Sequence, residues 1–231
     1  MGTVLAAISA LAEGGPGVLL PLLVGTLTGC ALKYAEIFVT MRHRQSGLAG
    51  PLAALQERAP RLARAYALLL LPVALLGMGN LAQVQVLSEA LARGAHLPRL
   101  AVGFGVLAVL LPLVRGGIGR IGRAASLCLP AAGALYVGAC ALALWRLRPA
   151  LPGALLSIFQ GALPFRPELF ALGIARGLFL CEAGMGTSAF AHGQSRAEAR
   201  VQGALGACEV LFSTFLCVLT ALLVLATGVP L

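Results

Sequence analysis

Long apolar runs, separated by short loops that carry arginines, constrain this chain more than any other feature of its sequence. The hydrocarbon core of a bilayer is about 30 Å thick, and a helix needs roughly 20 apolar residues to cross it. Charged residues make up only 11% of the chain, too few to coat a soluble domain. The sequence therefore predicts an all-α integral membrane protein with a single transmembrane domain over residues 1–231. We expect hydrophobic helices at residues 3–12, 18–41, 65–91, 100–114, 125–145, 169–195 and 203–228.

Two apolar segments are too short to cross a bilayer. The segment at 3–12 is followed by the turn sequence Gly14-Gly15-Pro16-Gly17, and we expect it to form half of a helix. The segment at 151–163 is bounded by prolines on both sides, which predicts a helix that lies on the outer membrane interface. A further full crossing at 151–163 is the alternative.

The arginines predict how the chain is oriented. Ten arginines lie in the loops after the second, fourth and sixth segments, and five lie in the loops on the opposite side. An excess of arginine marks the cytoplasmic side, so we expect a multi-pass protein of the bacterial inner membrane with its N-terminus in the cytoplasm. The net charge of +9 comes without a basic groove studded with aromatic residues, so we expect no nucleic-acid partner.

Neither a metal site nor an enzyme is predicted. The six cysteines are scattered through apolar stretches without paired spacing, which is typical of small packing residues. No HExxH motif and no pairing of a nucleophile with a base occurs, so we expect the protein not to be an enzyme.

Ionisable residues inside apolar helices are costly and are therefore candidates for function. Lys33 and Glu36 are three residues apart on one helix face, and we expect them to form a structural ion pair near the cytoplasmic end of their helix. The other candidates of this kind are Arg176, Glu182 and Glu209.

The segment at 177–188 places Glu182 among three glycines inside a run of membrane length. Glycine lets the backbone leave helical geometry, and the freed peptide groups can hold a carboxylate or a cation. The alternative is that Gly184 and Gly186 only allow two helices to pack closely.

A second polar cluster lies in the middle of the segment at 65–91. Asn80, Gln83 and Gln85 carry three carboxamides within six residues, so we expect them to face the protein interior. Binding of a ligand and hydrogen bonding to neighbouring helices both remain open for them.

These segments, read in order, carry motifs that resemble one known family. Residues 31–36 are similar to its MATKYAE motif, residues 79–85 to GNxxQxN, and residues 116–121 to GGIKRI. Residues 176–192 are similar to RGxFSNEAGxGSAPxAH, and residues 201–203 to the RQG that follows it. Over essentially the whole chain, the sequence resembles the alanine/glycine:cation symporter family, also called sodium:alanine symporters.

The resemblance implies a partial inverted-repeat helix bundle, leucine-transporter-like and of the amino acid-polyamine-cation type, with discontinuous helices 1 and 6. It implies transport of a small neutral amino acid of the alanine/glycine class, coupled to sodium or protons, with no organic cofactor. The implied substrate-binding residues are Thr3, Gln83, Gln85, Cys181, Gly184 and Gly186. The implied ion-binding residues are Gly2, Thr3, Glu182 and Thr187.

The chain also departs from the family pattern. Leu180 and Cys181 stand where the family has Ser-Asn, Thr3 replaces an Asn, and Gln85 replaces another. Leucine and cysteine supply no strong oxygen ligand for a hard cation, which leaves backbone carbonyls to serve. The family has further helices, so the alternative is a truncated, non-transporting membrane homologue with a scaffold or regulatory role. The exact substrate, the coupling ion and assembly into a homo-oligomer stay open.

Overall fold

The computed structural model describes residues 3–44, 50–75 and 80–228, and the described residues form helices and loops without strands. The chain divides into two compact units, residues 77–145 and residues 3–76 with 146–231. We describe each unit by itself, and the prediction of one domain over 1–231 stays a prediction.

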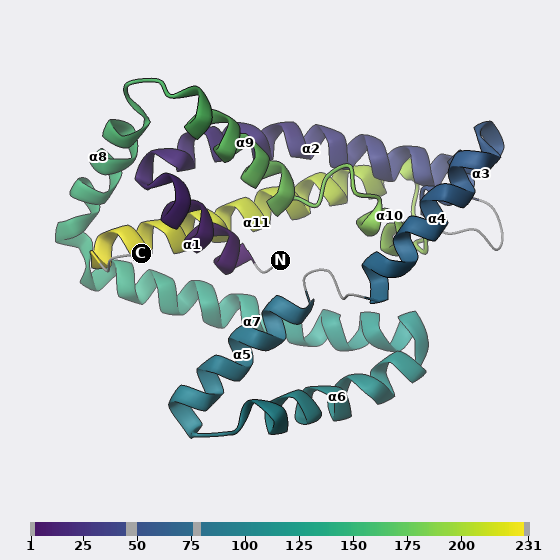
Figure 1. Cartoon of the computed structure of the whole chain (residues 1–231), viewed down its shortest axis with the longest axis horizontal. Helices are drawn as coiled ribbons and strands as arrows, with labels where there is room; N and C mark the ends of the chain where they lie inside the picture. Colours follow the sequence, from purple (N-terminus) through teal and green to yellow (C-terminus); the bar gives the residue numbers. More distant parts are fainter. Residues whose placement is uncertain (1–2, 45–49, 76–79, 229–231) are drawn as a thin grey trace. The chain divides into compact units, whose positions relative to one another are not determined.

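The larger unit contains most of the helices. They are α1 (Thr3–Gly14), the 3-10 turn η1 (Pro16–Val18), α2 (Leu19–Arg42), α3 (Leu52–Arg58), α4 (Pro60–Leu75), η2 (Arg148–Ala150), α8 (Leu151–Ala162), α9 (Pro167–Leu180), α10 (Thr187–His192) and α11 (Ala199–Thr227). Figure 1 shows α2 and α11 lying side by side, and α9 also packs on α2. A core cluster of eight buried residues is formed by Ala6, Ala7, Ala10, Val18, Leu22, Leu169, Leu180 and Cys217.

Glycines let α2 and α9 come into backbone contact. A Cβ atom on Gly25 of α2 would lie 2.5 Å from the carbonyl oxygen of Ile174, and one on Gly177 of α9 would lie 2.4 Å from that of Leu22. Small residues four apart on both helices allow this approach, as is common where helices pack inside membranes. The close contact of α2 with α9 positions the C-terminal end of α9 next to the polar residues of α2.

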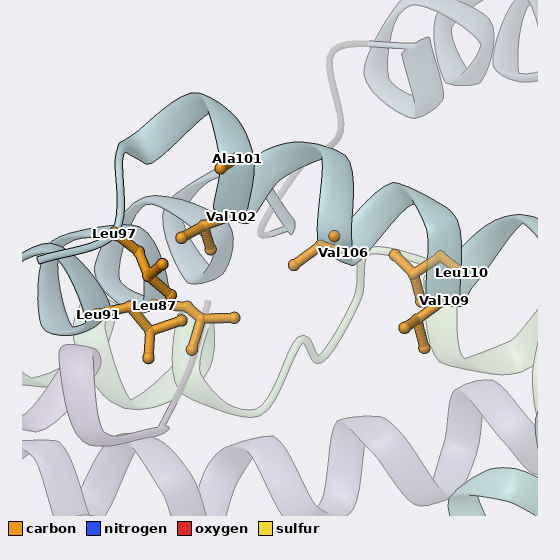
Figure 2. Close-up of a pocket in the computed structure, with 9 residues that line it drawn as sticks. Leu87, Leu91, Leu97, Ala101, Val102, Val106, Val109 and Leu110 are labelled. Carbon is orange, nitrogen blue, oxygen red and sulfur yellow. The ribbon is translucent and has the colours of Figure 1, made fainter. Parts of the chain in front are cut away.

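The smaller unit consists of α5 (Asn80–Ala95), α6 (Arg99–Arg115) and α7 (Gly117–Arg146). A pocket of about 470 Å³ lies between α5 and α6, and Figure 2 shows Leu87 and Leu91 of α5 facing the valines of α6 across it. Every residue that lines the pocket is Leu, Val, Ala or Gly. Such a lining offers no side chain that could orient a charged ligand.

The observed helices match most of the predicted segments, with several differences. The short helix α3 was not expected, and α7 begins at Gly117 although we expected a helix only from residue 125. The segment expected at 65–91 corresponds to α4 and α5, and residues 76–79 lie outside the described part of the chain. The segment expected at 151–163 is the helix α8, whose 12 residues span about 18 Å, less than a bilayer core.

Three of the described helical segments are long and apolar enough to cross a membrane: Pro16–Arg42, Gly117–Arg146 and Ala199–Thr227. These segments and the all-helical architecture agree with the predicted membrane helix bundle. The inverted-repeat arrangement of that bundle stays a prediction.

Candidate functional site

The segment expected at 169–195 is not one continuous helix. The helix α9 ends at Leu180, α10 begins at Thr187, and residues 181–186, here called the break, are non-helical. Gly184 and Gly186 have φ angles of 78° and 79°, and Glu182 has a φ angle of 51°. A residue with a side chain rarely adopts this left-handed conformation, so Glu182 is held there by its surroundings.

Two side chains of α2 bind the backbone of the break. The Lys33 ammonium donates a hydrogen bond to the carbonyl oxygen of Cys181 at 3.0 Å, and Glu36 accepts one from the N–H of Gly184 at 2.8 Å. The predicted Lys33–Glu36 ion pair is therefore wrong, and no such pair occurs among the described residues. The sequence placed both residues on one face of α2, but the broken end of α9 lies against that face and offers peptide groups to each of them.

The two carboxylate oxygens of Glu36 differ in their hydrogen bonding. Its Oε2 atom accepts the bond from Gly184, whereas Oε1 is buried and lacks a hydrogen-bond partner among the residues that the structure describes. A buried carboxylate oxygen without a partner costs free energy, and an ammonium group or a cation would satisfy it. Glu36 is a candidate for function from its place in an apolar helix, but its spacing from Lys33 predicts an ion pair and does not indicate this buried oxygen.

Tyr66 of α4 also contacts the break. Its hydroxyl donates a hydrogen bond to the carbonyl oxygen of Met185 at 3.3 Å. A Cβ atom on Gly186 would lie 2.1 Å from that hydroxyl, so Gly186 provides both the left-handed turn and the room for Tyr66. Sequence reasoning missed Tyr66, and the available signal was a tyrosine at the polar start of an apolar helix, where its hydroxyl can reach a partner.

Two predicted ion-binding residues face each other across the break. The Thr187 hydroxyl donates to a Glu182 carboxylate oxygen at 3.3 Å. Glu182 is exposed and Thr187 is half-buried, so the pair remains open to an incoming ion. Carboxylate and hydroxyl oxygens are the ligands that hard cations prefer.

Cys181 contributes its backbone to the break, and its thiol packs against α2. The residue is 4% exposed, and a Cβ atom on Gly29 would lie 2.8 Å from its sulfur. The thiol lies 4.0 Å from the carbonyl oxygen of Thr26.

The buried side chain of His192, at the end of α10, contacts two residues of α11. His192 is 8% exposed, its Nε2 lies 3.2 Å from a carboxylate oxygen of Glu209, and its Nδ1 lies 2.7 Å from the amide nitrogen of Gln202. The motif segments 176–192 and 201–203, which are separate in the sequence, therefore meet in space. Glu209, one of the candidate ionisable residues, has a histidine partner here.

Three further candidates are Gly2, Thr3 and Arg176. Thr3 is the first residue of α1, and Gly2 lies outside the described residues. Arg176 forms an ion pair with Glu13 of α1.

Gln83 and Gln85 are exposed on α5, because leucines occupy the face of α5 that meets α6 (Figure 2). Their expected place in the protein interior stays a prediction, because the smaller unit is described by itself. Gln85 donates a hydrogen bond to Glu89 at 3.2 Å. Both glutamines belong to the smaller unit, so their predicted meeting with the break stays a prediction.

The break thus brings together non-helical peptide groups, the exposed carboxylate of Glu182 and, from α2, the buried Oε1 atom of Glu36. No group of three His, Cys, Asp or Glu side chains that could hold a metal ion occurs in the described part of the chain. Peptide groups and carboxylates at a helix break can bind a zwitterion and a monovalent cation.

Sequence comparison matches this chain to known transporters. The model of the sodium:alanine symporter family matches residues 1–230. The chain is 26% identical to the sodium/alanine symporter AgcS of Methanococcus maripaludis, over 98% of this chain and 54% of that protein. It is 30% identical to the sodium/proton-dependent alanine carrier protein of Bacillus sp. PS3, over 99% of this chain and 54% of that protein. The chain is also 27% identical to an uncharacterized transporter of Haemophilus influenzae, over 98% of this chain and 54% of that protein. The chain thus spans about half the length of the curated relatives it matches.

Proposed function

Because this chain belongs to the sodium:alanine symporter family, we propose that it takes part in secondary active transport of a small neutral amino acid of the alanine/glycine class, coupled to sodium or protons. It is a multi-pass membrane protein, and we place it in the bacterial inner membrane with its N-terminus in the cytoplasm.

The coupling ion binds at Glu182 and Thr187 in this proposal. Their oxygens are 3.3 Å apart at the edge of the break, and Glu182 adds the negative charge that a monovalent cation or a proton requires. Gly2 and Thr3, which the resemblance also assigns to the ion, would complete the site from the start of the chain.

The amino acid binds beside this ion, at the break. The observation that carries the proposal is the buried Oε1 atom of Glu36, which lacks a partner among the described residues and would accept a hydrogen bond from the substrate ammonium. The backbone of Cys181, Gly184 and Gly186 forms the wall of this site, with peptide groups already oriented by α2. Thr3, Gln83 and Gln85 are the further substrate contacts that the resemblance implies.

The test is counterflow of labelled alanine and glycine in proteoliposomes, with and without sodium. We expect Glu182→Gln and Thr187→Val to lower sodium-coupled alanine exchange about tenfold or more, since a charged hydrogen bond is worth about 1.5–3 kcal/mol. Glu198→Gln and Thr227→Val, which alter exposed residues outside the break, are the matched controls and should keep normal exchange.

Exchange that does not respond to sodium or to a pH gradient, in wild type and variants alike, would contradict coupled transport. A folded chain without any exchange would favour the alternative, a non-transporting membrane homologue with a scaffold or regulatory role.

A further inference from the structure

Lys33 is unusual in both its type and its position. The chain contains sixteen arginines and a single lysine, and that lysine is only 5% exposed. Its ammonium nitrogen lies 3.0 Å from the carbonyl oxygen of Cys181, the residue that caps the C-terminal end of α9. Burial of a charged group is costly unless an opposite charge or an oriented dipole compensates it.

No acidic side chain of the described residues provides that compensation. No carboxylate there comes within salt-bridge distance of the Lys33 ammonium, and Glu36, one turn further along α2, binds the N–H of Gly184 instead. The group that faces the ammonium is the carboxyl end of α9, where the aligned peptide dipoles leave about half a negative charge.

The carboxyl end of a broken membrane helix is also where a mobile cation finds carbonyl oxygens. We propose that the Lys33 ammonium is a cation built into the chain, which occupies the carboxyl end of α9 in place of a mobile monovalent cation. A lysine suits this position because its ammonium is a compact point charge on a flexible stem, whereas the planar guanidinium of arginine is larger.

Lys33 at the end of α9 also restricts where a transported cation can bind at the break. Because the Lys33 ammonium occupies the carbonyl oxygen of Cys181, the transported cation binds only beside Glu182 and Thr187. This restriction of the transport site rests on the proposed function. The occupancy of the α9 end by Lys33 does not depend on transport and can be tested without it.

The experiment measures thermal unfolding of the chain in lipid nanodiscs, in choline chloride and in sodium chloride of equal ionic strength. The variants are Lys33→Met and Lys33→Gln, which remove the charge, and Lys33→Arg, which keeps it. Arg176→Met is the matched control, because it removes one positive charge from α9 itself without touching Cys181.

In choline, we expect both neutral variants to unfold at least roughly 3 °C below wild type. Sodium should raise their unfolding midpoints toward the wild-type value, because a cation that binds only the folded state stabilises it. Lys33→Arg and Arg176→Met should show no such recovery beyond that of wild type. A neutral variant that is unfolded in choline and folded in sodium supports the proposal equally.

Binding of ²²Na⁺ gives a second measurement. Placed in a Glu182→Gln background to remove the proposed transport site, Lys33→Met should bind about one more sodium ion per chain than its Lys33 parent. Equal sodium binding by the two, or neutral variants that sodium does not stabilise, would overturn the proposal. These outcomes leave the counterflow test of the proposed function unaffected, so the two can fail independently.

Discussion

The carboxylate of Glu36 accepts a hydrogen bond from the backbone N–H of Gly184 at 2.8 Å, although the two residues are 148 positions apart in the chain. A side chain on α2 thereby holds the turn that separates α9 from α10. The same carboxylate keeps a second, buried oxygen without a partner among the described residues. The two oxygens of Glu36 can therefore be tested separately, one for structure and one for binding.

Glu36→Gln should preserve the turn and weaken binding, because the amide keeps one oxygen for Gly184 but loses the negative charge. We expect near-normal hydrogen-exchange protection of residues 181–186 and a KM for alanine raised about tenfold. Glu36→Leu removes both oxygens and should also lose the protection. Equal protection in the two variants would contradict a role for Glu36 in holding Gly184, and Glu198→Gln serves as the control.

Gly186→Ala should be more destabilising than Gly184→Ala. Both glycines have left-handed φ angles, so each substitution costs about 1–2 kcal/mol of backbone strain. An added methyl at Gly186 would also meet the Tyr66 hydroxyl at 2.1 Å, whereas at Gly184 the nearest contact is Leu32 at 3.2 Å. Thermal unfolding of the two variants measures the difference.

Combining Gly186→Ala with Tyr66→Ala should recover the stability that is lost to the clash with the Tyr66 hydroxyl. The stability that is lost to backbone strain should not be recovered. If the double variant is no more stable than the summed effects of its two single substitutions predict, the contact between Tyr66 and Gly186 does not explain why Gly186→Ala is more destabilising than Gly184→Ala.

Gly177→Val should disrupt the packing of α2 on α9. The added side chain would begin 2.4 Å from the carbonyl oxygen of Leu22, and both partners at this contact are backbone, so the helices must move apart. We expect a loss of about 2 kcal/mol or more in the free energy of unfolding, since overpacking costs about 1–3 kcal/mol. The control is Gly105→Ala in α6, where an added Cβ meets nothing within 4 Å and should stabilise the helix slightly. A Gly177→Val chain as stable as wild type would contradict the close contact of these helices.

His192→Ala should loosen α10 from α11. The buried imidazole bonds to both Glu209 and Gln202, so we expect its loss to cost about 1–3 kcal/mol. A double-mutant cycle of His192→Ala with Gln202→Ala, followed by thermal unfolding, isolates the shorter contact. Additive effects in that cycle would mean that the contact between His192 and Gln202 contributes nothing to stability.

Several features of this protein could be predicted from particular residues. The apolar runs predicted the helices that became α2, α6, α8 and α11 to within a few residues, and the match over residues 1–230 confirms the family resemblance carried by the motifs. The start of α7 was predicted too late, because glycines and arginines between residues 116 and 124 are typical of a loop and yet continue the helix.

The sequence by itself determined that this chain forms apolar helices of membrane length, because the cost of placing a residue in lipid depends mainly on that residue and its near neighbours. Only the tertiary structure decided that Lys33 and Glu36 bind the break rather than each other. That choice depends on α2 and α9 meeting at glycines in distant parts of the chain. The contact brings peptide groups that make no helical hydrogen bond to a face where local spacing predicts only an ion pair.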